Sequence, residues 1–173
     1  MKDLFVAYSR YNRQANAAIL SKLEGMSADQ LAFPIKAYYR TIVDTVFHVM
    51  KSDVKWLYRL SGFLPSSVEK NALDAYMVDG AVEVSLVAGN LADFVGLRKR
   101  IDEAMIAVVA AIPETAFPKN LEIEFGPKTI ERPLWQLLMQ WFNHHTHHRG
   151  QVSIQLDALG IDNDFSGVLD KIV

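Results

Sequence analysis

Apolar residues recur every three or four positions along four long stretches of this chain, and this spacing limits the fold more than any other feature. It places the apolar side chains on one face of an α-helix, where they need a partner that buries them. The stretches cover residues 3–24, 38–60, 84–111 and 133–159. A glycine or proline follows each of them, as is common where helices end. The sequence therefore predicts an all-α fold in which four long helices form a four-helix bundle.

A short segment between the third and fourth predicted helices has a different pattern. In LEIEFGPKTIE, residues 121–131, apolar and polar side chains alternate on both sides of a Gly-Pro pair, which is typical of a small β-hairpin. Pro133 fits the first turn of the last helix because an N–H group has no helical partner there. Residues 63–80 have a mixed pattern with room for one short helical piece. No repeat or linker divides the chain, so residues 1–173 are predicted to form a single domain.

The composition excludes several classes of protein. The 173 residues carry a formal net charge of −2, without the basic excess that a dedicated nucleic-acid-binding protein needs. No apolar run approaches the roughly 18 residues of a membrane span, and charged residues interrupt the N-terminal segment where a signal peptide would be apolar. There is no cysteine, which excludes disulfides and thiolate metal ligands. We expect a cytoplasmic protein with neither a nucleic acid nor a membrane as its partner.

Four of the five histidines lie close together in WFNHHTHHRGQ, residues 141–151. His144 and His148 are four positions apart, so on a helix both imidazoles lie on one face and can reach a single metal ion. Two other pairs, His144 with His147 and His145 with His148, are three positions apart and also share a face. The apolar stripe of the predicted helix passes through His144 and His148, which favours these two as ligands and the other two as neighbours.

A third ligand has to come from another part of the chain. The fifth histidine, His48, lies in the second predicted helix, and an aspartate or glutamate is the alternative. The apolar face of that helix is centred on Val46 and Met50, whereas His48 shares its side with polar residues. The pattern by itself therefore indicates an exposed His48, although a polar side that faces a metal ion would have the same pattern.

The two histidine segments together resemble a known family. FHVMKSDVKWLYRLSG and, far downstream, FNHHTHHRGQVSIQLDALG are similar to the DinB/YfiT-like superfamily of metalloenzymes. Its members are four-helix bundles with one ligand histidine on the second helix and an H-x-x-x-H-R-G-Q segment on the fourth. The resemblance implies that His48, His144 and His148 bind the metal.

Three further polar residues are expected to lie behind the ligands and to hold them by hydrogen bonds. Asp44 precedes His48 by one turn of the predicted helix, and His147 and Gln151 lie beside the cluster. The residue after His144 is a histidine rather than a glutamate, so the cluster is not the H-E-x-x-H motif of metallopeptidases. Peptidase activity is therefore not expected.

The resemblance also implies what such a site does. Characterised members are metal-dependent transferases that attach a low-molecular-weight thiol to an electrophile or isomerise a thiol adduct, and others are described as hydrolases. We therefore expect a thiol S-transferase or related detoxification enzyme with a small-molecule substrate. A metal-dependent hydrolase is the first alternative, and a non-catalytic stress-response bundle with a structural metal is the second. Three imidazoles suit several divalent ions, of which we favour zinc and nickel.

Several other residues carry structural predictions. Gly150 in mid-helix costs about 1 kcal/mol relative to alanine, which indicates that a neighbouring helix approaches closely there. Arg149 is expected to pair with a carboxylate on another helix. The three tryptophans, Trp56, Trp135 and Trp141, lie within apolar faces and are expected in the core. The aromatic residues of the first helix, together with the hairpin, predict an apolar surface that a homodimer would bury.

Overall fold

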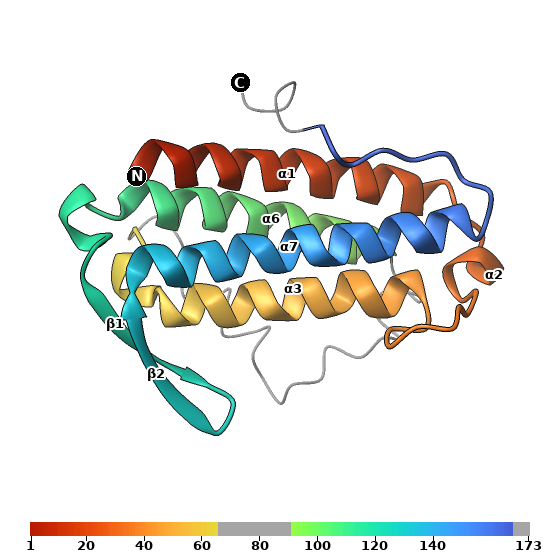
Figure 1. Ribbon diagram of the computed structural model, residues 1–173. Helices are drawn as coiled ribbons and strands as arrows, with labels where there is room; N and C mark the ends of the chain where they lie inside the picture. The colour runs from red at the N-terminus through yellow and green to blue at the C-terminus, as the bar shows by residue number, and fades with distance from the viewer. Residues whose placement is uncertain (66–90, 168–173) are drawn as a thin grey trace.

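Four long helices lie side by side and form the body of the protein (Figure 1). The computed structural model describes residues 1–65 and 91–167. The long helices are α1 (Lys2–Glu24), α3 (Ile42–Arg59), α6 (Leu91–Ala111) and α7 (Leu134–Asp157). Helices α1 and α3 each pack against both α6 and α7. The predicted all-α four-helix bundle is therefore confirmed.

The start of α3 depends on local capping as well as on the apolar pattern. Helix α3 begins at Ile42, later than the predicted residue 38. The side chain of Thr41 accepts a hydrogen bond from the backbone N–H of Asp44, and the carboxylate of Asp44 accepts one from the backbone N–H of Thr41. This capping box satisfies N–H groups that the helix itself leaves unpaired. A one-turn helix, α2 (Ala28–Leu31), was not predicted and begins with a box of the same kind.

The connection between α3 and α6 is described in part. A 3₁₀ turn, η1 (Ser61–Phe63), follows α3. From residue 66 onward, the mixed pattern noted for residues 63–80 lies outside the described residues, and so do the first residues of the helix predicted to begin at 84. From Leu91 onward that helix is present, and it ends at Ala111 as predicted.

The predicted β-hairpin is present and is slightly longer than residues 121–131. Strand β1 (Asn120–Phe125) pairs antiparallel with strand β2 (Lys128–Pro133). Gly126 in the two-residue turn has a φ of +63°, a conformation that glycine adopts without strain and that suits such turns. The hairpin projects from the end of the bundle at which α7 begins (Figure 1).

The apolar faces of the helices meet in one core that includes two of the three tryptophans. Trp56 of α3 and Trp141 of α7 are buried, and their stacked rings have centroids 5.8 Å apart. Trp135 is partly buried and packs against this core. The predicted core position is confirmed for Trp56 and Trp141, whereas Trp135 lies at the edge.

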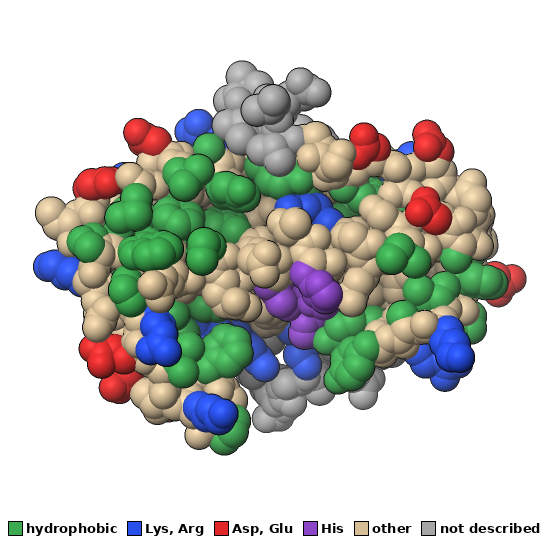
Figure 2. All heavy atoms as spheres, viewed as in Figure 1, with side chains coloured by type: hydrophobic (Ala, Val, Ile, Leu, Met, Phe, Trp, Pro, Cys, Tyr) green, Lys and Arg blue, Asp and Glu red, His purple; other side chains and the backbone are tan. Residues whose placement is uncertain are grey.

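Some large apolar side chains remain exposed. Leu4 and Met139 are 56% and 55% exposed, and the side chains of Tyr8 and Phe125 are exposed as well. Figure 2 shows hydrophobic side chains gathered over α1 and α7 at the hairpin end of this face. The homodimer that would bury such a surface stays a prediction. None of the described helices combines the length and the apolarity needed to cross a membrane.

A carboxylate lies at a fully buried position of α3 and joins this helix to α7 and α6. Asp53 accepts hydrogen bonds at Oδ1 from Nε1 of Trp141 and from Nε2 of His145, both at 2.7 Å. Its Oδ2 accepts from the guanidinium of Arg98 on α6. Burial raises the pKa of Asp53, but the effects of His145 and Arg98 outweigh it and the pKa is lowered overall. Asp53 is therefore an ionised acceptor for three buried donors.

The same network extends to α1. Arg98 also donates to Oδ1 of Asp102 at 2.9 Å, and Asn16 of α1 donates to that oxygen at 2.8 Å. All of these side chains are buried. The four long helices are thus linked by a continuous set of hydrogen bonds inside the bundle, in addition to their apolar contacts. Buried hydrogen-bond networks of this kind specify how helices are arranged.

Two predictions for the HRGQ segment are wrong. A Cβ atom at Gly150 would meet no atom within 4 Å, so a close helix contact does not explain this glycine. Arg149 donates to the amide oxygen of Asn12 at 2.7 Å, and its guanidinium lies 4.7 Å from the ring centroid of Tyr11. Within the described residues α1 therefore offers Arg149 an amide and an aromatic ring, where a carboxylate had been predicted.

Candidate metal centre

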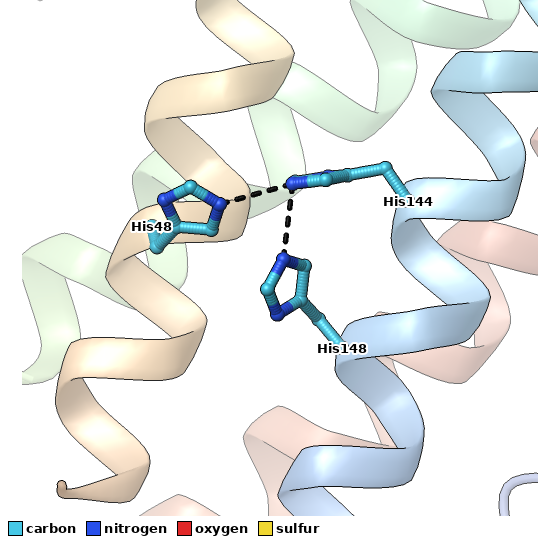
Figure 3. Close-up of side chains that lie close together, drawn as sticks. All are labelled: His48, His144 and His148. Carbon is cyan, nitrogen blue, oxygen red and sulfur yellow. Dashed lines mark hydrogen bonds between the residues drawn. The ribbon is translucent and has the colours of Figure 1, made fainter. Parts of the chain in front are cut away.

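Three histidines from two helices converge about midway along the bundle. His48 projects from α3, and His144 and His148 project from consecutive turns of α7 (Figure 3). Nε2 of His144 lies 3.0 Å from Nε2 of His48 and 3.0 Å from Nε2 of His148. Within the described residues, these three form the one group whose possible ligand atoms all lie within 4.8 Å of one another. The closely spaced pair and the distant histidine thus form a single cluster.

The spacing of the three nitrogens fits one divalent ion. Zinc binds imidazole nitrogen at about 2.0–2.1 Å, so two nitrogens on one ion lie about 2.8–3.4 Å apart at bond angles of about 90–110°. The two separations of 3.0 Å lie within this range. All three donors are imidazoles, which suit zinc, nickel, copper or iron. The residues of the cluster therefore fit a transition-metal ion.

A hydrogen bond behind His148 determines which of its ring nitrogens faces the cluster. Nδ1 of His148 lies 2.6 Å from Oε1 of Gln151, and because an amide oxygen only accepts, Nδ1 carries the proton. Nε2 of the neutral ring then directs a lone pair towards His144. Nε2 of His144 carries at most one proton, so it cannot donate a hydrogen bond to both of the Nε2 atoms that lie 3.0 Å from it. The buried Nδ1 of His144 has no hydrogen-bond partner among the described residues. A cation that accepts all three lone pairs removes this conflict.

Burial keeps the three rings neutral at pH 7. The pKa of His144 is lowered to about 4, chiefly by burial and then by the neighbouring ring of His148. Burial also lowers the pKa of His148 to about 4, against a smaller opposing effect of its hydrogen bond. Burial, followed by the charges of Lys51 and Lys55, lowers the pKa of His48. Neutral imidazole is the form that binds a metal ion.

A known protein family matches nearly the whole chain. The model of the DinB family matches residues 1–164 of the chain. The chain belongs to the DinB family. The matched range includes both histidine segments and all four long helices, so the family resemblance of the sequence is confirmed. Comparison with curated proteins and with solved structures gave no match.

Gln151 connects two histidines at the edge of the three-histidine cluster. Its amide oxygen accepts from Nδ1 of His148, and its amide nitrogen donates to Nε2 of His147 at 3.2 Å. The amide therefore holds the ring of His148 in one orientation, and His147 in turn contacts the amide. Gln151 and His147 were predicted to hold the ligand histidines by hydrogen bonds, and these contacts are of that kind. Their effect on metal binding stays a prediction.

Asp44 has a different hydrogen-bond partner from the predicted one. Its carboxylate accepts from the backbone of Thr41 in the capping box of α3. The ring of His48 stacks instead on Tyr39, with centroids 4.6 Å apart, and Tyr39 also meets the edge of His148 at 5.6 Å. Tyr39 was missed because the apolar pattern placed it in a helix, whereas it lies in the non-helical segment before α3.

An open cleft of about 840 Å³ borders the three-histidine cluster. His48 and His144 line it, together with Tyr39 and several side chains of α3 that lie towards the hairpin. Figure 2 shows histidine at the surface in the middle of one face, with Lys and Arg side chains close to it. A small molecule in this cleft would lie next to His48 and His144.

The metal-free protein is expected to lose stability as the pH falls from about 6.5 to about 4. In this window the unfolded chain protonates His144 and His148, whose ordinary pKa is about 6.5, while the native rings with a pKa of about 4 stay neutral. Unfolding therefore takes up protons, and acid favours it. Urea midpoints of chelator-treated protein at several pH values measure the effect.

The matched control for this pH series is the double variant His144→Gln, His148→Gln. Glutamine does not titrate, so the variant should show a smaller fall in midpoint between pH 6.5 and 4, although all carboxylates are unchanged. Equal falls in the two proteins would show that these histidines do not have depressed pKa values in the folded state.

Proposed function

We propose that this protein is a metal-dependent enzyme that transfers a low-molecular-weight thiol to an electrophile. His48, His144 and His148 would hold a divalent ion, with zinc and nickel as the proposed metals. The observation that carries the proposal is the convergence of three Nε2 atoms at the border of an open cleft. Three protein ligands leave a position for an exogenous group, as in catalytic rather than structural zinc sites. When bound, a divalent ion lowers the pKa of a coordinated thiol or water.

The residues around the cleft favour a thiol over water as the nucleophile. Asp44 is the one carboxylate-bearing residue among the described residues that line the cleft, and its side chain caps α3. Hydrolysis by activated water benefits from a carboxylate base that takes up a proton, as in the H-E-x-x-H enzymes. A thiol with a lowered pKa releases its proton to solvent and needs no such base. The described residues therefore support thiol transfer better than hydrolysis.

The side chains have separate tasks in this proposal. The three imidazoles hold the ion, Gln151 orients the ring of His148, and Tyr39 covers one side of His48. The thiol loses its proton to the buffer, a carbon–sulfur bond forms, and the leaving group departs with the electron pair of the broken bond. No redox reagent is required for this exchange.

Untagged protein tests the proposal, since a polyhistidine tag would itself bind nickel. We expect about one zinc or nickel ion per chain, by elemental analysis. In the cobalt-substituted protein, N-acetylcysteamine should produce a sulfur-to-metal charge-transfer band. Its conjugation to 1-chloro-2,4-dinitrobenzene, with release of chloride, should stop when a chelator is added.

The alternative functions give different results in the same samples. Metal-dependent cleavage of an ester without any thiol would identify a hydrolase. A stoichiometric ion with neither a charge-transfer band nor turnover would identify a structural metal in a non-catalytic bundle. Either outcome would overturn the proposed thiol transfer.

A further inference from the structure

Positively charged side chains continue from His48 along the same side of α3. Lys55 and Arg59 follow His48 by seven and eleven residues, and at 100° per residue each lies within about 20° of it around the helix axis. Lys51 is one turn from His48, and Arg40 precedes the helix. All of these side chains line the cleft that borders the histidines. We call Lys55 and Arg59 the basic stripe.

The guanidinium of Arg59 is held in place at the far end of the basic stripe. Its carbon Cζ lies 4.9 Å from the ring centroid of Trp56 and 4.8 Å from that of Phe125. Nε donates to the backbone oxygen of Glu124 in the hairpin at 3.0 Å. The two terminal amino groups donate to no acceptor among the described residues. A planar fork fixed in this way is prepared for two parallel hydrogen bonds to a carboxylate or phosphate.

The described residues that line this cleft include one carboxylate beside the charges of Lys55 and Arg59. Asp44 is the carboxylate among them, and it binds the start of α3 at the opposite end of the helix from Arg59. The lysines also act on the histidines, because the charges of Lys51 and Lys55 contribute to the lowered pKa of His48. An anion at the Arg59 end of the cleft would be attracted by Lys55 and Arg59.

The distance between His48 and Arg59 sets the length of the ligand. His48 and Arg59 are eleven residues apart, which corresponds to about 16 Å along the helix axis at 1.5 Å per residue. A short acid such as a three-carbon thiol acid cannot contact both residues. An extended molecule with its reacting group at one end and its acidic group at the other can do so.

We propose that the substrate is an elongated anion whose carboxylate or phosphate binds Arg59 while its reacting end lies at the three histidines. Lys55 lies between these two positions on α3 and also attracts the anion. Arg59 is a binding residue for the remote part of the substrate and takes no part in bond making. The position of the reacting end rests on the proposed function, whereas the binding of the acidic group to Arg59 does not.

Thiols of graded length test this subsite. The probes are 3-mercaptopropionate, 11-mercaptoundecanoate, the matching phosphonate and the uncharged 11-mercapto-1-undecanol, titrated into zinc-loaded protein and followed by tryptophan fluorescence. We expect the two long acids to bind most tightly. Arg59→Gln should weaken these two by about tenfold, the loss typical of a charge-assisted hydrogen bond. It should leave the short acid and the alcohol unchanged. The carboxylate and the phosphonate together show which acidic group the fork prefers.

Arg10→Gln is the matched control, because it removes an exposed arginine of α1 that does not line the cleft. It should leave the binding of every probe unchanged. Equal binding of 11-mercaptoundecanoate to wild type and Arg59→Gln would overturn the proposal, and so would equal weakening by the two arginine variants. Circular dichroism establishes that both variants are folded.

A titration of metal-free protein with undecanoate separates this proposal from the proposed function. Undecanoate has the acidic group but no thiol, so its binding does not depend on the metal or on thiol chemistry. If it binds wild type but not Arg59→Gln, the anion subsite stands even when no thiol binds to the zinc-loaded protein. If thiols bind and undecanoate binding is insensitive to Arg59, the thiol site stands and the anion subsite is disproved.

Discussion

Replacing Asp53 by asparagine is expected to lower the free energy of unfolding by about 3–5 kcal/mol, the loss typical of a buried ion pair deprived of one partner. The carboxylate is fully buried and accepts from Trp141, His145 and Arg98. Asparagine has one acceptor oxygen, and its NH₂ group would face one of these donors. A domain of this kind is stable by about 5–15 kcal/mol, so the change is a large fraction of the total. Urea denaturation followed by circular dichroism measures it.

Glu103→Gln is the control for Asp53→Asn, because it also removes one carboxylate charge that is paired with an arginine. Glu103 and its partner Arg13 are 62% and 42% exposed, and exposed pairs contribute about 1 kcal/mol or less. The urea midpoint of this variant should therefore stay close to that of wild type. Equal shifts in the two variants would mean that the buried network adds nothing beyond an ordinary surface pair.

Replacing His144 by alanine is expected to weaken metal binding by more than about 100-fold, which exceeds the 10–100-fold typical of residues that only support a ligand. Nε2 of His144 lies 3.0 Å from both other Nε2 atoms, so its removal leaves two nitrogens that no longer share a common neighbour. Competition with a chromophoric chelator measures the affinity for zinc and for nickel. Thiol conjugation should be lost in the same variant.

His147→Ala is the control for His144→Ala, since it removes an imidazole from the same helix one turn away. His147 contacts the amide of Gln151 at the edge of the cluster, so its loss should weaken metal binding far less than the loss of His144. His145 is unsuitable for this purpose because it belongs to the buried network of Asp53. Wild-type affinity in His144→Ala would exclude this histidine from the metal centre.

The local parts of the fold and site could be predicted from the sequence because they depend on spacing along one helix. The apolar periodicity identified all four long helices, and the four-residue separation placed His144 and His148 on one face. The hairpin followed from alternation around Gly126, whose positive φ suits the turn. Each of these features is determined by residues within a few positions of one another.

The position of His48 depended on information that one helix does not contain. Its side of α3 is polar, so the pattern indicated exposure, and only the family resemblance brought it to the cluster. In the structure it is half-buried, 3.0 Å from His144 and stacked on Tyr39. The spacing of residues along α3 does not predict which helices pack beside it, because that depends on the packing of the whole bundle.

The buried network had a signal in the sequence that was not used. Asp53 falls between Met50 and Leu57 at helical spacing, so a charged residue interrupts an apolar stripe. On α6, Arg98 and Asp102 are four positions apart within another apolar face. A charge at a core position requires a buried partner. The identity of that partner could not be predicted, because Asp53 binds residues from two other helices.

The hydrogen bonds of Asp53 have a consequence for the choice of histidines. Three pairs on α7 are close enough to bind one ion, and a modest rotation of the helix about its axis would exchange one pair for another. Trp141 and His145 both donate to Oδ1 of Asp53, and this contact fixes the rotation at which His144 and His148 face α3. A carboxylate outside the histidine cluster thereby determines which pair on α7 faces His48. A substitution at Asp53 is therefore expected to weaken metal binding although it alters none of the three histidines.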